Sequence, residues 1–182
     1  MKFSSFKHYL SVFLNKKSFS LFADSIKWFI EDHIVPYSKI EKTGNEGFIH
    51  PSVNFKSPEN VIIGNCTRIQ PNVCLWASPN SKIIIGEFSG LGPGTMLFSS
   101  NHKYEFGEIY SRQPWVEKDI VIGKNVWVGA GCILTAGVTI GDGSVIGAGS
   151  VVNKNVPPNS LAVGVPAKII KDGSQLDVKH LE

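Results

Sequence analysis

The chain has 182 residues, of which 18% are charged and 18 are glycine, and its formal net charge is +3. This length allows one substantial hydrophobic core, or one domain with an appendage. The net charge is small, and lysines and arginines are scattered without a basic run, which argues against nucleic acid as a partner.

Residues 1–40 are predicted to form a helical capping segment. Apolar side chains recur here at helical spacing in two sets, which predicts one or two short helices over residues 1–35. We expect these helices to cover the open end of the structure that follows, or to pack between subunits. A membrane-surface helix is the alternative, because lysines and aromatic side chains are mixed in this segment. The two apolar sets are Phe3, Phe6, Leu10, Phe13 and Leu14, and then Phe22, Ile26, Phe29 and Ile30.

Neither the N-terminus nor the cysteines indicate an exported protein. The opening apolar stretch is broken by Lys7, His8, Lys16 and Lys17 and lacks a clear small-residue cleavage site, so we expect no secretory signal. Nothing approaches the roughly 20 apolar residues that a membrane-spanning helix needs. The three cysteines lack CxxC spacing, and we interpret them as reduced thiols of a cytoplasmic protein.

From residue 63 onward, aliphatic residues recur every six positions and are often followed by glycine. This period fits neither the 3.6-residue period of a helix nor the alternation of a single strand. We interpret each hexad as a short extended segment whose aliphatic side chain points inward, followed by a tight corner. Three such faces make a triangular coil of about eighteen residues, and stacked coils form a parallel β-helix. The recurring residues are Ile63, Ile69, Leu75, Ile85, Leu91, Leu97, Ile122, Val128, Leu134, Ile140, Ile146 and Val152.

The predicted β-helix domain spans residues 41–165 and contains two irregularities. Four extra residues near Ser81 predict a small bulge, and residues 103–121 predict a long loop outside the prism wall. The two prolines of "VPPNSL" lack the donors that a strand ladder needs and should end the repeat, which leaves residues 166–182 as a C-terminal tail. The coils are expected at 63–80, 85–102, 122–139 and 140–157, after a partial coil around Ile49 and Phe55.

The segment "IVIGKNVWVGAGCILTAGVTIGDGSVIGAGSVVNKNVPPNSLAVGVPAKIIK" (residues 120–171) resembles the hexapeptide-repeat acyltransferases. It is most similar to their sugar O-acetyltransferase branch, which includes galactoside and maltose acetyltransferases and enzymes that modify surface polysaccharides. The resemblance covers about residues 60–171. It implies an all-β, left-handed parallel β-helix, whereas the general preference for right-handed connections would predict the opposite hand. It also implies a homotrimer with active sites between subunits, acetyl-CoA as donor, no metal, and a role in polysaccharide biosynthesis.

His102 ends the hexad "LFSSNH", directly before the repeat is interrupted. In the family, the catalytic histidine lies at the edge of a coil, ahead of an excursion towards the adjacent subunit, so the resemblance implies this role for His102. An imidazole with a pKa of about 6.5 suits a general base that removes the proton of a sugar hydroxyl. We therefore expect direct attack on acetyl-CoA in a ternary complex, in a pocket covered by the loop "KYEFGEIYSRQPWVEKD". Glu105, Glu108 or a backbone carbonyl would orient the ring.

The resemblance further implies binding residues, carried over position by position. For acetyl-CoA they are Trp127, Ala130, Ala148, Asn153 and Lys154, with Lys168 and Lys171 near the nucleotide phosphates. Small residues at 130 and 148 would let the pantetheine arm approach the backbone, although both also suit a tight corner. For the acceptor, Asn72 would present an amide and Tyr104 an aromatic ring. Asparagine is also a common corner residue, and loop aromatics also serve packing.

Three other functions stay open at this level. The same fold could acetylate an amine or an antibiotic instead of a sugar, because hexads encode no acceptor. A non-enzymatic trimeric β-helix module would need neither the interrupted coil nor the histidine. A metal-dependent enzyme of this architecture would need several histidines at a subunit interface. The repeat region offers His102, with only His50 near the first partial coil. A lipid-linked acceptor would be compatible with peripheral membrane contact through the N-terminus.

Overall fold

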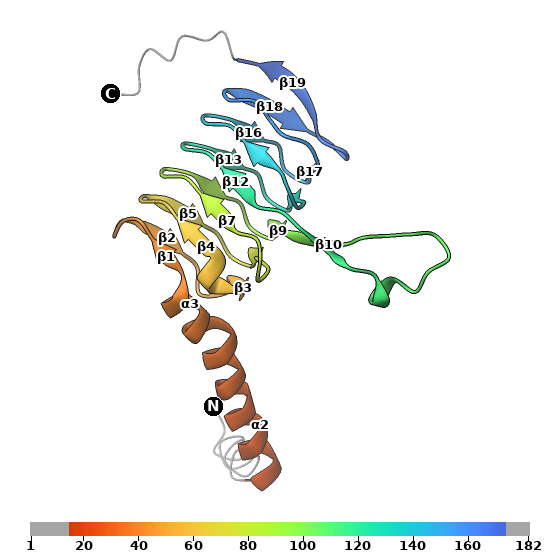
Figure 1. Ribbon diagram of the computed structural model, residues 1–182. Helices are drawn as coiled ribbons and strands as arrows, with labels where there is room; N and C mark the ends of the chain where they lie inside the picture. Colours follow the sequence, from red (N-terminus) through yellow and green to blue (C-terminus); the bar gives the residue numbers. More distant parts are fainter. Residues whose placement is uncertain (1–14, 174–182) are drawn as a thin grey trace, which may run out of the picture.

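The computed structural model describes residues 15–173, which form a triangular prism and a helix that projects from one end of it (Figure 1). Three β-sheets make the faces of the prism, and each coil of the chain contributes one strand to each face. Within the prism these strands pair in parallel, apart from the last one, β19. The architecture is the left-handed parallel β-helix that the hexads and the family resemblance predict.

Sheets A, B and C follow one another in every coil. Sheet A contains β1 (Glu41–Lys42), β4 (Val61–Ile63), β7 (Ile83–Ile85), β12 (Ile120–Ile122) and β15 (Thr139–Ile140). Sheet B contains β2 (Gly47–Ile49), β5 (Thr67–Ile69), β8 (Gly90–Leu91), β13 (Trp127–Val128), β16 (Val145–Ile146), β18 (Ser160–Val163) and β19 (Lys168–Asp172). Sheet C contains β3 (Asn54–Lys56), β6 (Cys74–Trp76), β9 (Met96–Phe98), β14 (Ile133–Leu134) and β17 (Val151–Val152). A short 3-10 helix, η2 (Pro58–Asn60), follows β3.

The hexad aliphatics fill the centre of the prism as three ladders. In sheet C, for example, the register places Leu97 beside Leu75 on one side and beside Leu134 on the other, and Val152 follows Leu134. All the hexad residues named above are at most 3% exposed. The residues that flank them on each strand point outward, as the two-residue alternation of a strand requires. The sequence prediction of inward-facing hexads is therefore confirmed.

Leu134→Ala should lower the free energy of unfolding by about 2–5 kcal/mol, because it empties a fully buried position between two coils. Ile133→Ala is the matched control, since Ile133 precedes it on β14 and is only partly buried on the outer surface. Guanidinium unfolding followed by circular dichroism, at one protein concentration, measures both. Equal losses for the two variants would contradict the assignment of Leu134 to the core.

The N-terminal helix does not lie across the end of the prism. It consists of α2 (Lys16–Phe29), one π-helical segment η1 (Ile30–Ile34) and α3 (Val35–Lys39), which together run almost without interruption. Its first turn is capped by Asn15, whose side chain accepts a hydrogen bond from the backbone N–H of Lys17 at 2.9 Å. The helix was expected to cap the first coil. Only its C-terminal part, η1 and α3, packs on that coil, where Pro36 is buried. The first of the two expected apolar sets, from Phe3 to Leu14, lies outside the described residues.

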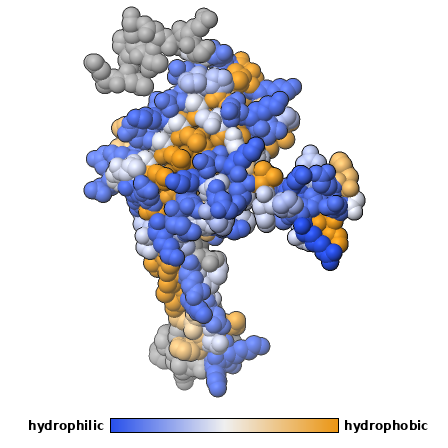
Figure 2. Space-filling view, in the orientation of Figure 1, coloured by the Kyte–Doolittle hydropathy of each residue, from blue (hydrophilic) through white to orange (hydrophobic). Residues whose placement is uncertain are grey.

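Helix α2 has an apolar stripe along one side and no buried residue. The stripe is visible as orange atoms along the projecting helix in Figure 2. Its side chains are each between 41% and 59% exposed, so within one chain no other described element buries them. Among the described helices, none is long and apolar enough to cross a membrane. The stripe residues are Phe19, Phe22, Ile26 and Phe29 of α2, and Ile30 at the start of η1.

The repeat continues for one strand beyond the double proline. Pro157 and Pro158 lie in a corner, where the strand ladder needs no backbone N–H donor, so the prolines do not interrupt it. Strand β18 then pairs in parallel with β16. The last strand, β19, turns back antiparallel onto β18 and closes sheet B. The predicted tail at 166–182 therefore begins too early, because Lys168–Asp172 belongs to the sheet.

Candidate active site

The interruption after the third coil is a projecting arm built on two antiparallel strands. Strand β10 (Ser100–His102) leaves the prism and β11 (Trp115–Glu117) returns to it, with His102 paired to Trp115. Between them lies a short 3-10 helix, η3 (Tyr110–Arg112). Figure 1 shows the arm in green, extending well away from the prism. The loop that was predicted to lie outside the prism wall is thus present. It was also expected to cover a pocket, and within one chain it points away from the prism instead.

The arm leaves from the C–A corner, where sheet C passes to sheet A, and a buried serine cluster fixes this point. Ser99 Oγ accepts a hydrogen bond from the backbone N–H of Ser78 at 3.1 Å. It also lies 2.7 Å from Ser81 Oγ, which donates to the carbonyl of Ser99 at 2.9 Å. The returning chain is joined to the same carbonyl by the backbone N–H of Lys118 at 2.9 Å.

The bulge near Ser81 is the second half of this attachment. Asn80 donates from its amide to Glu117 Oε2 at 2.6 Å, and Asp119 Oδ1 accepts from the backbone N–H of Lys82 at 2.7 Å. The hydrogen bond from Asn80, helped by one from Ser78, lowers the pKa of the Glu117 carboxyl and so favours its ionised form. The two irregularities predicted separately from the sequence therefore form one structure, in which the bulge of one coil holds the base of the arm of the next.

His102 is half-buried at the base of the arm and is held by aromatic rings. Its ring lies against that of Trp115, with centroids 3.8 Å apart and planes inclined by 35°. Tyr110 approaches edge-on, with centroids 5.4 Å apart. Among the described side chains, Nδ1 of His102 is a buried nitrogen without a hydrogen-bond partner. The ring is therefore positioned by packing rather than by a carboxylate.

Among the described residues, no hydrogen bond or ion pair joins His102 to Glu105 or Glu108, the carboxylates that were expected to orient it. Glu105 forms an ion pair with Lys103 at 2.9 Å on the exposed part of the arm. The backbone of this part is instead held by Gln113, whose buried amide accepts from the N–H of Glu105 at 2.7 Å and donates to the carbonyls of Glu105 and Glu108 at 3.2 and 3.4 Å. Gln113 was missed at the sequence level, because nothing in its neighbours marks a buried amide.

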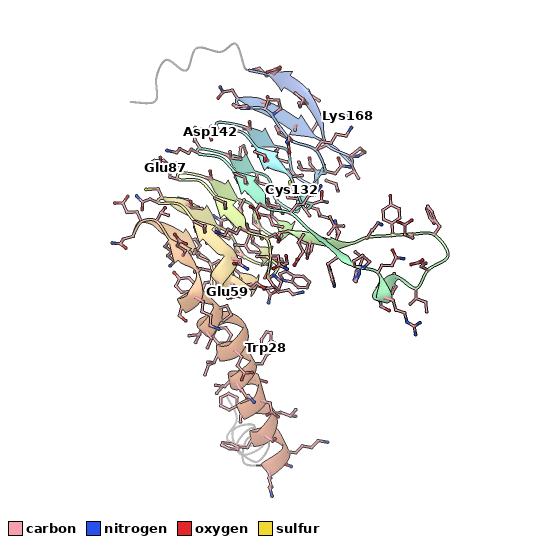
Figure 3. The ribbon with its side chains drawn as sticks, in the orientation of Figure 1. Trp28, Glu59, Glu87, Cys132, Asp142 and Lys168 are labelled. Atoms are coloured by element: carbon pink, nitrogen blue, oxygen red, sulfur yellow. The ribbon has the colours of Figure 1, made fainter. Side chains whose placement is uncertain are left out.

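The residues predicted to bind acetyl-CoA are distributed over two corners of the prism and over sheet B. Ala130 and Ala148 lie one above the other at the B–C corner, where Gly149 donates its N–H to the carbonyl of Ala130 at 2.8 Å. Both alanines are exposed. Trp127, 63% exposed, stands on the outer face of sheet B next to this corner. Lys168, labelled in Figure 3, and Lys171 follow on β19, both exposed.

The other predicted residues are on the opposite edge or on the arm. Asn153 and Lys154 are exposed at the C–A corner, on the same edge as His102 but nearer the C-terminal end. Asn72 belongs to the B–C corner and has a left-handed backbone with φ +59°, which supports its role as a corner residue. Tyr104 is 76% exposed and packs edge-on against Phe106, with ring centroids 5.9 Å apart. One chain thus brings neither Asn72 nor Tyr104 into contact with the ring of His102.

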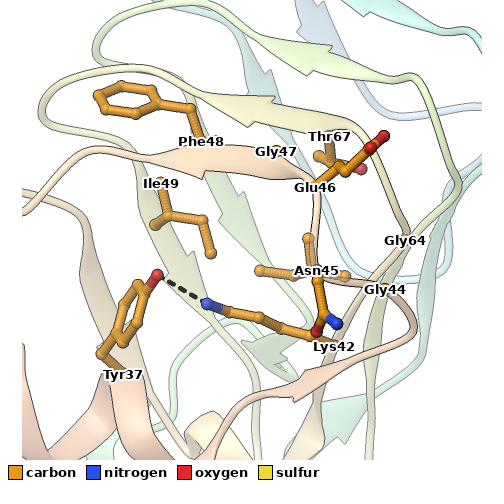
Figure 4. A pocket seen from close by; sticks show the side chains of 11 residues that line it. Tyr37, Lys42, Gly44, Asn45, Glu46, Gly47, Phe48, Ile49, Gly64 and Thr67 are labelled. Carbon is orange, nitrogen blue, oxygen red and sulfur yellow. Dashed lines mark hydrogen bonds between the residues drawn. The ribbon is translucent and has the colours of Figure 1, made fainter.

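A separate hollow at the helical end of the prism contains none of the predicted site residues. It is lined by residues such as Tyr37, Lys42 and Thr67, and Lys42 Nζ donates to the Tyr37 hydroxyl at 2.6 Å (Figure 4). Its volume is about 160 Å³, below the roughly 300 Å³ of ordinary ligand pockets. The described residues contain no group of three or more histidine, cysteine or acidic side chains that could hold a metal ion.

Comparisons with known proteins give a family and several solved structures. Residues 119–154 match the bacterial transferase hexapeptide (six repeats) family. An acetyltransferase with hexapeptide repeats from Vibrio cholerae, solved with acetyl coenzyme A, is 26% identical, with a TM-score of 0.71 over 88% of this chain and 91% of that one.

Two further structures are 30% identical to the chain. A maltose O-acetyltransferase from Clostridium difficile has a TM-score of 0.69, over 76% of this chain and 73% of that one. A galactoside acetyltransferase in complex with coenzyme A has a TM-score of 0.70, over 80% and 76%. No match was found among curated protein sequences.

Proposed function

Because the chain belongs to the hexapeptide-repeat acetyltransferases, we propose that it transfers the acetyl group of acetyl-CoA to a hydroxyl of a sugar or glycan. The observation that carries this proposal is His102, a half-buried histidine fixed at the base of an arm that interrupts the coil. Maltose and galactoside acetyltransferases among the similar structures support a sugar as acceptor. A role in polysaccharide biosynthesis is part of this proposal and would follow if the acceptor is a glycan.

The groups that would hold acetyl-CoA have suitable shape and charge. At the B–C corner, Ala130 and Ala148 present no side chain beyond Cβ, so an extended pantetheine arm can approach the backbone. The exposed indole of Trp127 offers an apolar surface beside them. Lys168 and Lys171 are exposed cations on the last strand, suited to phosphate groups. Similar structures that contain acetyl-CoA or CoA support acetyl-CoA as the ligand, while its contacts with these residues are part of the proposal.

A homotrimer would join the two edges of the site. In one chain, His102 lies at the C–A corner and the two alanines lie at the B–C corner. A groove between neighbouring prisms places one corner of a chain opposite the other corner of the next, so that each site draws on two chains. Three parallel prisms would also project their α2 helices from the same end, where the apolar stripes can pack together. Binding of the intact oligomer to anionic vesicles would instead assign the stripe to a membrane surface.

The chemistry proposed for His102 is that of a general base. As the acceptor hydroxyl forms its bond to the thioester carbonyl carbon, the imidazole takes the hydroxyl proton. The C–S bond then breaks, CoA leaves as a thiolate, and the imidazolium returns the proton to the sulfur. A thiolate is a good leaving group, so no covalent enzyme intermediate is needed.

We expect CoA to be released from acetyl-CoA only when a sugar or glycan acceptor is present. A thiol-reactive dye follows CoA release with a panel of glycosides, oligosaccharides and amines, and mass spectrometry identifies the acetylated product. An added mass of one acetyl group on a sugar supports O-acetylation. Transfer to the amines alone would overturn the proposed acceptor, while leaving an acyltransferase on the same fold.

A further inference from the structure

A second concave surface lies against the base of the arm, on the outer face of sheet C. It is an open cleft of about 300 Å³, at the lower end of the range for ligand pockets and large enough for one sugar unit. Three parallel strands and both strands of the arm contribute to it. The lining residues are Lys56, Trp76, Phe98, Ser100, Asn101 and Trp115.

The walls of this cleft are aromatic and well fixed. Trp76 packs edge-on against Phe98, with centroids 5.5 Å apart. Its indole N–H donates to Asn54 Oδ1 at 2.6 Å, which sets the orientation of the ring. Trp76 and Trp115 are nevertheless 40% and 54% exposed, so their faces are accessible. Rigid, exposed indoles are suited to packing against the apolar C–H face of a sugar ring.

The cleft carries one cation. Nζ of Lys56 lies 5.9 Å from the ring centroid of Trp76 and 5.8 Å from that of Trp115, within the range of a cation–π interaction with both. None of the ion pairs among the described residues involves Lys56. Within the described part of the chain, no carboxylate therefore lies at ion-pair distance from Lys56, and its positive charge favours an anion in the cleft.

The cleft adjoins the proposed catalytic base. Trp115 lines it and also stacks on the ring of His102 at 3.8 Å. Asn101, the residue before His102 on β10, contributes a polar side chain to the lining. Trp115 is therefore a wall that the cleft shares with His102.

We propose that this cleft binds the acceptor, and that the acceptor is a sugar with an anionic substituent, a carboxylate or a phosphate, paired with Lys56. This inference rests on the proposed function and adds the charge class of its substrate. Trp76 and Trp115 hold the ring of the sugar, and Lys56 selects the charged member of a pair of otherwise identical acceptors.

The test compares p-nitrophenyl β-D-glucuronide with p-nitrophenyl β-D-glucoside, which differ in charge at one carbon, and adds glucose 6-phosphate against glucose. For Lys56→Met we expect kcat/KM for the preferred anionic acceptor to fall by about 10- to 100-fold, the equivalent of one charged hydrogen bond, with little change for the neutral partner. Lys56→Arg should keep the preference. Lys39→Met, which removes an exposed lysine on α3, should match the wild type. The glucuronide and glucose 6-phosphate comparisons distinguish a preference for a carboxylate from a preference for a phosphate.

Isothermal titration calorimetry with the same compounds measures binding to the cleft even if no acetyl transfer occurs. Binding of an anionic sugar that is weakened by Lys56→Met, in the absence of any transfer, would support the cleft and count against the proposed reaction. Acetyl transfer that is equal for charged and neutral acceptors, or that is insensitive to Lys56→Met, would overturn the anionic acceptor and leave the acetyltransferase intact. The inference would also be overturned if no anionic sugar bound and if transfer did not distinguish charged from neutral acceptors.

Discussion

His102→Ala should reduce acetyl transfer by about 10²–10⁴-fold, the range for removing a general base. The loss should appear in kcat, while the KM for acetyl-CoA changes little, because the residues proposed to bind acetyl-CoA lie mostly on other elements. A steady-state assay of CoA release measures both constants. A product trace by mass spectrometry confirms that the remaining activity is transfer and not hydrolysis.

Two controls separate chemistry from structure in this experiment. His102→Gln keeps a side chain of similar size against Trp115 and should be as inactive as the alanine variant, which excludes collapse of the arm as the cause. His50→Ala removes a histidine whose Nδ1 lies 2.8 Å from Ser52 Oγ in the first coil, and it should keep full turnover. Turnover of His102→Ala close to that of the wild type would remove this residue from the reaction.

The prism could be predicted from the sequence because its rule is local. Each inward residue, such as Leu97 or Leu134, is followed by a corner within the same hexad, so spacing alone determines which side chains meet in the core. The register between coils then follows, since every coil repeats the same corners. The handedness did not follow from spacing and came from the family resemblance.

The attachment of the arm could not be predicted, because it depends on contacts between coils. Ser78, Ser81 and Ser99 are ordinary residues in the sequence and form a buried cluster only when two corners are stacked. The orientation of His102 was missed for the same reason. A carboxylate close in sequence is the simplest partner to expect, whereas Trp115 reaches His102 only through the pairing of β10 with β11.

The N-terminal helix shows another limit of periodicity. The recurrence of Phe22, Ile26 and Phe29 correctly predicts a helix with one apolar side. It does not identify the surface that this side meets, and in one chain α2 extends beyond the prism that it was expected to cover.

If each active site is built from residues of two chains, two variants that are inactive alone should restore activity when they assemble into the same trimer. His102→Ala removes the proposed base at the C–A corner. Ala148→Trp fills the exposed B–C corner where the pantetheine arm would lie, and we expect it to reduce transfer by about 10²-fold or more through displacement of the thioester. Neither substitution touches the buried ladders, so both chains should fold and assemble.

Mixed trimers made by co-expressing the two variants would contain some sites with an intact His102 from one chain and an intact corner from the next. With random assembly, about a quarter of the sites are of this kind, so activity should rise from below a few per cent to about a quarter of the wild-type value. Mixing the two purified variants without exchange of chains should restore nothing. If co-expressed chains of confirmed mixed composition stayed as inactive as each parent, His102 and Ala148 would have to act within one chain. Acetyl-CoA would then have to extend across sheet C of a single chain, from the B–C corner to His102 at the C–A corner.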